Sequence, residues 1–266
     1  MGPKAKLAWA LQKLEALDLE SQAFLESQPL RVVAEFDDES DCHVLRLRSQ
    51  VEGWTVRFGL MVGDFVHNAR SALDQAAWLL ACRSNPVEKL WEPRIARKIS
   101  FPVTSEPSLF HSHVALKFFA EDAVAVLEGL QPYQGGDTPE RIGWLDRLWN
   151  IDKHRVIHSG ALHVDLSGVS VAPAAIYVER DLIEVPPETT WHPLPERVED
   201  GAEVGRVRFR DGCGPPETEV QVKGQPTADI AFGSGPFSLS LGALGKLLTA
   251  TDDALSRIAV LPDHPS

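Results

Sequence analysis

Cysteine is scarce in this chain of 266 residues, which contains only Cys42, Cys82 and Cys213. The three are far apart and no C-x-x-C pair is present, so neither a zinc knuckle nor a disulfide framework is supported. Chains without disulfides are typical of a reducing compartment. The cysteine content therefore predicts a cytoplasmic protein.

Long apolar runs are also missing. A membrane-spanning helix needs about 20 consecutive apolar residues, and Asp64 interrupts the longest apolar run of this chain. The first residues, Met-Gly-Pro-Lys-Ala-Lys, are positively charged but lack the apolar segment that a secretory signal requires. We expect no membrane partner.

Glycine-rich phosphate loops and nucleophile motifs are absent as well. The sequence has no Walker loop and no G-x-G-x-x-G, and no nucleophile elbow supports a Ser-His-Asp triad, so no cofactor is expected. Basic residues are outnumbered, 26 against 38 acidic ones, for a formal charge of −12. Such a charge argues against broad coating of nucleic acid, although a local basic pocket can still bind one phosphate.

Helical periodicity dominates the first 160 residues. Apolar residues recur at the spacing of amphipathic helices over Ala5 to Ser27, Gly59 to Arg83, Pro107 to Leu116, Ala120 to Glu128 and Thr138 to Ser159. The last of these begins with Thr138-Pro139, a hydroxyl for the N-cap and a proline for the first turn. A closing helix is expected after the capping residue Ser240.

Strand-like runs occur in two places. Leu30 to Phe36 and Cys42 to Arg48 flank an acidic turn and predict a hairpin. After Gly160, alternating apolar runs separated by Gly/Pro clusters predict a small antiparallel sheet that the hairpin can join. The runs are Ala161 to Leu166, Val169 to Val178, Val204 to Phe209, Thr218 to Val222 and Ile230 to Phe232.

Together these patterns predict an α+β fold, a helical bundle of about five helices with an inserted antiparallel β segment and an early β-hairpin. The bundle is expected to occupy residues 1–160, with the hairpin at 30–48. The β-rich insertion is expected at 161–237, and a closing helix at 238–266 returns to the bundle.

The central helix carries an unusual polar arc. At about 100° per residue, His67, Arg70 and Asp74 fall nearly opposite the apolar stripe, on adjacent turns where their side chains can touch. Arginine suits a phosphate or carboxylate, and histidine suits proton transfer near neutral pH. Either these residues form a site or they make an ordinary solvated face.

Asp152 lies in the apolar arc of the helix that Thr138 opens. A lone ionised carboxylate buried there costs several kcal/mol, so Asp152 is expected to pair with a cation. Arg70 of the central helix is the candidate, and Arg155 is the local alternative.

The same helix concentrates positive charge in an otherwise acidic protein, at Arg147, Lys153, His154, Arg155 and His158. Either this is a binding site, or the basic residues simply favour the negative end of the helix dipole. A metal site would join histidines of this helix to His67 and Asp74. Arg70 and Lys153 would oppose a cation in the same place, so no metal is expected.

These motifs resemble those of a group of uncharacterised bacterial proteins that is common in actinobacteria. That group shares a helix of the type Gly-Asp-x-x-His-Asn-x-Arg-Ser-Ala-Leu-Asp, a Phe-Pro-Val/Ile segment, a Gln-Pro-Tyr turn and a later Asp-Lys-His-Arg. Here they are residues 63–74, 101–103, 131–133 and 152–155, and the resemblance spans roughly residues 5–160. It implies family membership without an established activity.

The chain is also similar to HEPN-type helical domains, many of which are metal-independent ribonucleases that work as dimers. Their mark is an arginine and a histidine separated by four to six residues on one helix, as Arg147 and His154 are. In the central helix the residue at the corresponding distance from Arg70 is Gln75, which cannot transfer protons. The resemblance implies RNA as the substrate and a homodimer as the assembly.

Two hypotheses follow. In the first, a HEPN-like protein of toxin or phage-defence type cleaves or binds RNA through His67, Arg70, Asp74, Arg147, Asp152, His154 and Arg155. A histidine would transfer protons at a ribose 2′-hydroxyl, the arginines would stabilise charge on the phosphate, and the carboxylates would orient the cations. In the second, the protein is a non-catalytic module. The same residues then form a structural network between two helices, and the β-rich segment binds a ligand or a protein.

Overall fold

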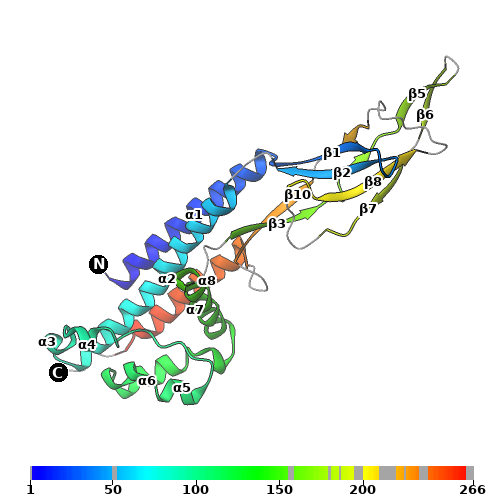
Figure 1. Ribbon diagram of the computed structural model, residues 1–266. Coiled ribbons are helices and arrows are strands. Elements are labelled where there is room, and N and C mark those ends of the chain that lie inside the picture. The colour runs from blue at the N-terminus through cyan, green and yellow to red at the C-terminus, as the bar shows by residue number, and fades with distance from the viewer. Residues whose placement is uncertain are drawn as a thin grey trace. The chain divides into compact units, whose positions relative to one another are not determined.

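The computed structural model describes residues 2–49, 53–154, 159–178, 181–185, 187–194, 200–209, 220–224, 226–233 and 239–261 (Figure 1). The chain forms two compact units. The helical unit comprises residues 1–19, 55–159 and 232–266, and the β unit comprises residues 20–54 and 160–231. The fold is α+β, as the sequence predicts. The hairpin, which the sequence analysis grouped with the helices, belongs to the β unit.

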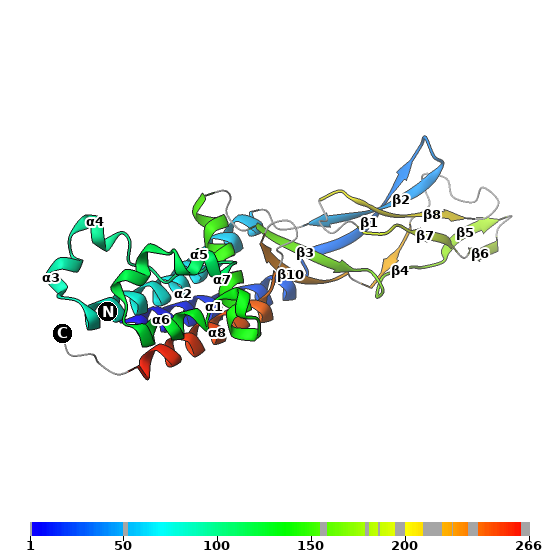
Figure 2. The same ribbon diagram turned by 90° about the horizontal axis from the view of Figure 1, so that it is seen from below.

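Four long helices build the helical unit, namely α1 (Pro3–Glu26), α2 (Trp54–Ser84), α7 (Asp137–His154) and α8 (Leu241–Ala259). Of these, α1, α2 and α8 run alongside one another and α7 crosses them (Figure 2). Shorter elements connect α2 to α7, namely α3 (Val87–Leu90), α4 (Pro93–Ala96), α5 (Pro107–His111), η1 (Val114–Phe118), α6 (Glu121–Glu128) and η2 (Pro132–Gln134). No helix among the described residues is both long and apolar enough to cross a bilayer.

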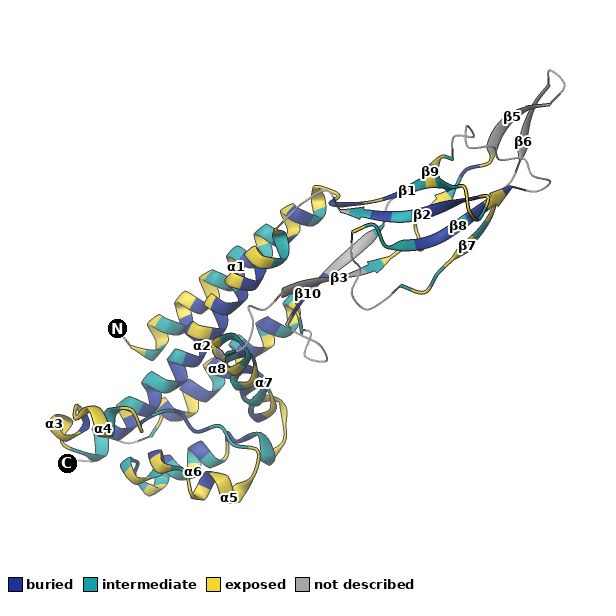
Figure 3. Ribbon diagram, viewed as in Figure 1, coloured by how far each residue is buried: buried dark blue, intermediate teal, exposed yellow. Residues whose placement is uncertain are grey.

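Helix α2 is the core of this unit, and buried residues recur along its length (Figure 3). Phe65 and Leu73 are completely buried. The N-terminal part of α1 packs against α2, because Lys6 donates to the Asn68 side chain at 3.2 Å and Lys13 pairs with Asp64 at 3.1 Å. Because α2 is buried on most of its circumference, other elements also cover its polar side.

Helix α7 begins one residue earlier than the sequence predicts, and its expected N-cap has another role. Thr138 lies inside the helix, and its hydroxyl donates to the Asp253 carboxylate of α8 at 2.8 Å. This hydrogen bond is the main reason that the pKa of Asp253 lies below its ordinary value. The prediction of a Thr138 cap is therefore wrong, because the hydroxyl joins two helices instead.

The β unit contains the expected hairpin, formed by β1 (Leu30–Asp37) and β2 (Cys42–Ser49). The hairpin joins later strands, as predicted, in an antiparallel sheet of order β1-β2-β8-β7. Strand β8 (Glu203–Phe209) pairs with β2, and β7 (Pro187–Trp191) pairs with β8 at the edge. The sequence analysis missed β7 because it took the Gly/Pro clusters between the apolar runs as separators, whereas an edge strand tolerates the missing N–H of Pro187.

Three smaller sheets contain the other described strands. One sheet has the order β11-β10-β3, with β3 (Ser159–Asp165), β10 (Thr227–Gly233) and β11 (Leu239–Ser240). The run that was expected from Val169 to Val178 is divided into β4 (Ser170–Val171) and β5 (Ala174–Val178). Strand β4 pairs with β9 (Val222–Lys223), and β5 pairs with β6 (Asp181–Val185), which was also missed. Of the run expected from Thr218 to Val222, residues 218 and 219 lie outside the described residues, and its last residue, Val222, begins β9.

Two helical glycines give a matched test of the packing. A methyl group at Gly143 of α7 would lie 2.9 Å from Cγ of Pro132, whereas Gly245 of α8 has no atom within 4 Å of that position. We expect Gly245→Ala to raise the free energy of unfolding by about 0.5–1 kcal/mol, since alanine is the better helix former. We expect Gly143→Ala to lower it by about 1–2 kcal/mol through overpacking. Urea denaturation measures both, and a stabilising Gly143→Ala would contradict this packing.

Candidate functional site

Arg70 is the centre of the candidate site and is only 5% exposed. Its Nη2 donates to the carbonyl oxygen of Phe101 at 2.7 Å and lies 3.2 Å from Oδ1 of Asp74. Its Nε lies 3.5 Å from Oδ1 of Asp146 on α7. Two carboxylates therefore face one buried guanidinium.

Arg70 and Asp74, one turn apart on α2, bind the backbone carbonyl and the backbone N–H of Phe101. While Arg70 donates to its carbonyl, Oδ1 of Asp74 accepts a hydrogen bond from its N–H at 3.0 Å. Aromatic rings complete the enclosure, because the guanidinium carbon lies 5.9 Å from the centre of the Phe101 ring and 5.4 Å from that of Trp149. Such cation–π contacts favour a desolvated arginine.

Gln131 holds the next residues of this segment from the other side. It is fully buried, and its Nε2 donates to the carbonyl oxygens of Pro102 and Leu127 at 2.9 and 2.8 Å. Its Oε1 accepts from the backbone N–H of Thr104 at 3.0 Å. The segment Phe101–Thr104 is thus fixed by α2 at one end and by Gln131 at the other. We call Arg70, Asp74, Asp146, Phe101 and Gln131 the Arg70 network.

The expected pairing of Arg70 with Asp152 is wrong, although the two helices do lie together. Asp152 contacts α2 at Gly63, where a Cβ atom would lie 2.8 Å from its Oδ1. Asp146 is six residues earlier on α7, about 9 Å along the helix at 1.5 Å per residue. Gly63 precedes Arg70 by a similar distance, so Asp152 faces α2 at Gly63 and Asp146 is the residue that faces Arg70.

Asp146 is the carboxylate that the sequence analysis missed. It follows Ile142 by four residues and precedes Trp149 by three, so its place in the inward arc was the available signal. Burial raises the pKa of Asp146 above its ordinary value, the charge of Arg70 opposes that shift, and the charge of Asp74 adds to it. Asn150 donates to its Oδ2 at 2.9 Å.

A groove of about 770 Å³ opens beside the network, a volume typical of ligand sites. Its wall comes from α7 and from the residues after Phe101, and includes Val103, Thr104, Ser105, Glu140, Trp144, Asp146, Arg147 and Asn150. The Arg147 guanidinium lies over the Trp144 ring, 5.7 Å from its centre. Asp146 therefore belongs to both the network and the groove.

The other predicted site residues are placed as follows. His67 is exposed on α2, so the polar arc predicted there is divided between an exposed imidazole and a buried guanidinium. His154 ends α7, but its side chain and the whole of Arg155 lie outside the described residues. The alternative pairing of Asp152 with Arg155 lies outside them too.

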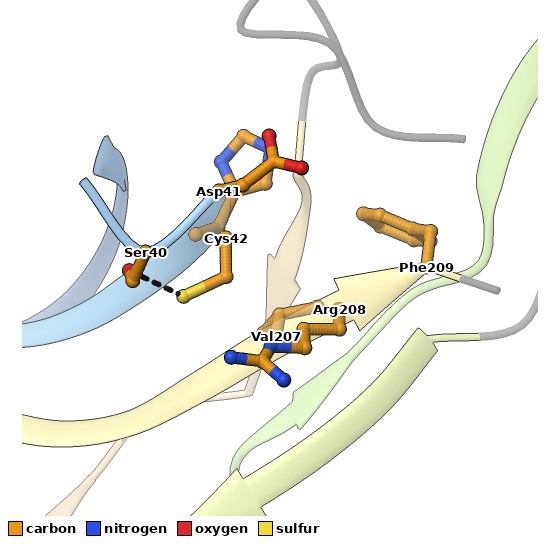
Figure 4. Close-up of a pocket in the computed structure, with 7 residues that line it drawn as sticks. Ser40, Asp41, Cys42, Val207, Arg208 and Phe209 are labelled. Atoms are coloured by element: carbon orange, nitrogen blue, oxygen red, sulfur yellow. Dashed lines mark hydrogen bonds between the residues drawn. The ribbon is translucent and has the colours of Figure 1, made fainter. Parts of the chain in front are cut away.

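A second pocket, of about 310 Å³, lies in the β unit where the hairpin turn meets the end of β8 (Figure 4). Ser40 and Cys42 are hydrogen-bonded there, with 2.9 Å between Oγ and Sγ, and the thiol residue is 2% exposed. Burial lowers the pKa of the neighbouring His43. Within the described part of the chain, no group of three His, Cys, Asp or Glu side chains is arranged to hold a metal ion.

No protein-family model matches the chain, and no curated protein or solved structure does so either. The Arg70 network joins three segments that are far apart in the sequence, namely residues 63–74, 101–103 and 131–133. Arg70 and Gln131 are buried within it, whereas the Asp74 and Asp146 side chains are 31% and 21% exposed. The exposed chemical groups of this region belong to the groove.

The network predicts a large loss of stability when Arg70 is removed. In Arg70→Ala two carboxylates lose their cation, which costs about 3–5 kcal/mol for a buried pair. The matched control is Arg141→Ala on α7, whose pair with the 81% exposed Asp137 is a surface ion pair. That change is expected to cost at most about 0.5 kcal/mol. Chemical denaturation of both variants measures the difference, and similar losses would contradict a buried network.

The raised pKa of Asp146 predicts a pH dependence. Because the folded chain holds this proton more tightly than the unfolded chain, the group adds to stability below its ordinary pKa of 3.8. That contribution is lost as pH rises through the raised pKa. Asp146→Asn keeps an uncharged group at the site, so its stability relative to the native chain should increase from pH 4 to pH 7. A relative stability that falls over this range would refute the assignment.

Proposed function

We propose that the helical unit is a non-catalytic binding module in which the Arg70 network is structural and the groove binds a ligand. The observation that carries this proposal is the enclosure of Arg70. Its Nε and Nη1 make no hydrogen bond among the described residues, yet both are closed to solvent. An arginine that recognises phosphate needs accessible N–H groups, whereas Nη2 of Arg70 contacts Asp74 and Phe101 and its Nε faces Asp146.

The groove defines the chemistry of the ligand. Its carboxylates Glu140 and Asp146 accept hydrogen bonds, Arg147 and Asn150 donate them, and Trp144 offers an apolar ring. A ligand that carries both donors and acceptors, of the size of a short peptide or a nucleotide, matches this lining. Ligand sites typically have a preformed wall and a small number of polar groups, which fix the orientation of the ligand.

Titration of the isotope-labelled protein with tripeptides and mononucleotides tests the proposal by NMR. We expect backbone amide shifts at Thr104, Trp144 and Asn150 with at least one of these probes. Arg147→Ala should weaken that binding about tenfold or more, as loss of a charged hydrogen bond does. Arg141→Ala, on the same helix but outside the groove lining, should leave it unchanged. An absence of shifts at the groove with every probe would contradict the proposal.

A second candidate is a HEPN-like cytoplasmic ribonuclease that acts as a homodimer, and one observation favours it. Arg147 lines the groove, and residue 154 follows it by two helical turns on the same face of α7. In this candidate His154 transfers protons at the ribose 2′-hydroxyl, while Arg147 stabilises charge on the phosphate.

Incubation of the purified protein with total RNA, without added metal, tests the second candidate. It predicts RNA fragments that His154→Ala abolishes, because the proton-transferring group is lost. His67→Ala removes an exposed histidine of α2 that is outside the groove lining and should leave cleavage intact. RNA that stays whole over a range of salt and pH would count against cleavage and leave the binding module as the function.

A further inference from the structure

The residues that follow α2 form a basic patch, which consists of Lys89, Trp91, Arg94, Arg97 and Lys98 on and beside α3 and α4. All five are exposed. They lie within ten residues of one another in two consecutive single-turn helices, so their charges fall within about one to two Debye lengths at physiological salt. The patch is separate from the residues that line the groove.

The four cations of the patch have no acidic partner among the residues that the structure describes, and neither Glu88 nor Glu92 in the same stretch pairs with them. Other arginines of this acidic protein are paired, for example Arg48 with Glu35 at 2.6 Å and Arg257 with Asp253 at 2.8 Å. Four unpaired cations in an acidic chain are suited to an external polyanion.

Trp91 adds a stacking surface to these charges. Its side chain is 67% exposed, and its ring packs against Trp78 of α2 with 5.2 Å between the ring centres. The neighbouring Leu90 and Ile99 are buried and anchor the segment. An indole that is held on one side and open to solvent on the other is an aromatic platform for a flat partner.

We propose that the basic patch binds single-stranded nucleic acid, with a base stacked on Trp91 and phosphates bound by the four cations. Apart from Trp91, the only exposed large apolar residue from 86 to 99 is Val87, which is too little apolar surface for a membrane-binding helix. The described segment has no continuous helix or hairpin long enough to read a duplex groove. The surrounding negative charge of the chain is screened beyond about 10 Å at 0.1 M salt. This inference goes beyond the proposed function, since it concerns a different surface.

Fluorescence anisotropy of the full chain with labelled 12-nucleotide oligouridylate and oligothymidylate tests the proposal. Trp91→Ala should weaken binding about fivefold or more, the loss typical of one stacked base. The double variant Arg94→Ser/Lys98→Ser should weaken it and reduce the slope of log affinity against log salt by about 1.4, or 0.7 per phosphate contact. Lys117→Ser/Lys246→Ser removes the same charge from exposed positions elsewhere and should change affinity less than about twofold.

Several outcomes would overturn the proposal. One is an absence of binding to either oligonucleotide at low salt, and another is equal weakening by the patch variant and its control. Tighter binding to a 12-base-pair duplex would show that unstacked bases are not recognised. Sedimentation with phosphatidylserine vesicles in the absence of oligonucleotide binding would show that the polyanion is a membrane. Circular dichroism spectra that match the native chain establish that each variant is folded. An unchanged oligonucleotide affinity of Arg147→Ala separates this surface from the groove.

Discussion

The requirement to neutralise one buried guanidinium organises the helical unit. Removing the charge of Arg70 from water is costly, and only excellent geometry offsets that cost. The chain meets it with carboxylates from two helices, a backbone carbonyl and two aromatic rings. Each of these partners comes from α2, α7 or the segment around Phe101. Satisfying Arg70 therefore fixes where those three elements lie with respect to one another.

The groove is a consequence of this arrangement. Its wall combines α7 with the residues that follow Phe101, which are the two elements that the network holds against α2. Asp146 connects the two, because one face of its carboxylate meets Arg70 and the residue also lines the groove. The pKa of Asp146 is raised because the fold buries its carboxyl group. A binding site with such rigid support is preorganised for its ligand.

The sequence predicted the elements better than their contacts. Apolar periodicity located the long helices and the hairpin within a few residues, because burial sets that period directly. It placed Arg70 on a solvated or functional face, since periodicity along α2 cannot show that α7 and Phe101 cover this face. Asp146 was overlooked for the same reason, as its partner is more than seventy residues away in the sequence. Strand β7 was missed because local turn propensity of proline was given more weight than sheet pairing.

A double-mutant cycle between Arg70 and Asp146 tests the account most directly. The free energies of unfolding of Arg70→Met, Asp146→Leu, the double variant and the native chain give the coupling between the two side chains, free of their separate effects. We expect a favourable coupling of about 1–3 kcal/mol at pH 7, since the pair is buried and both partners are positioned. A coupling near zero would contradict the claim that this ion pair joins α2 to α7.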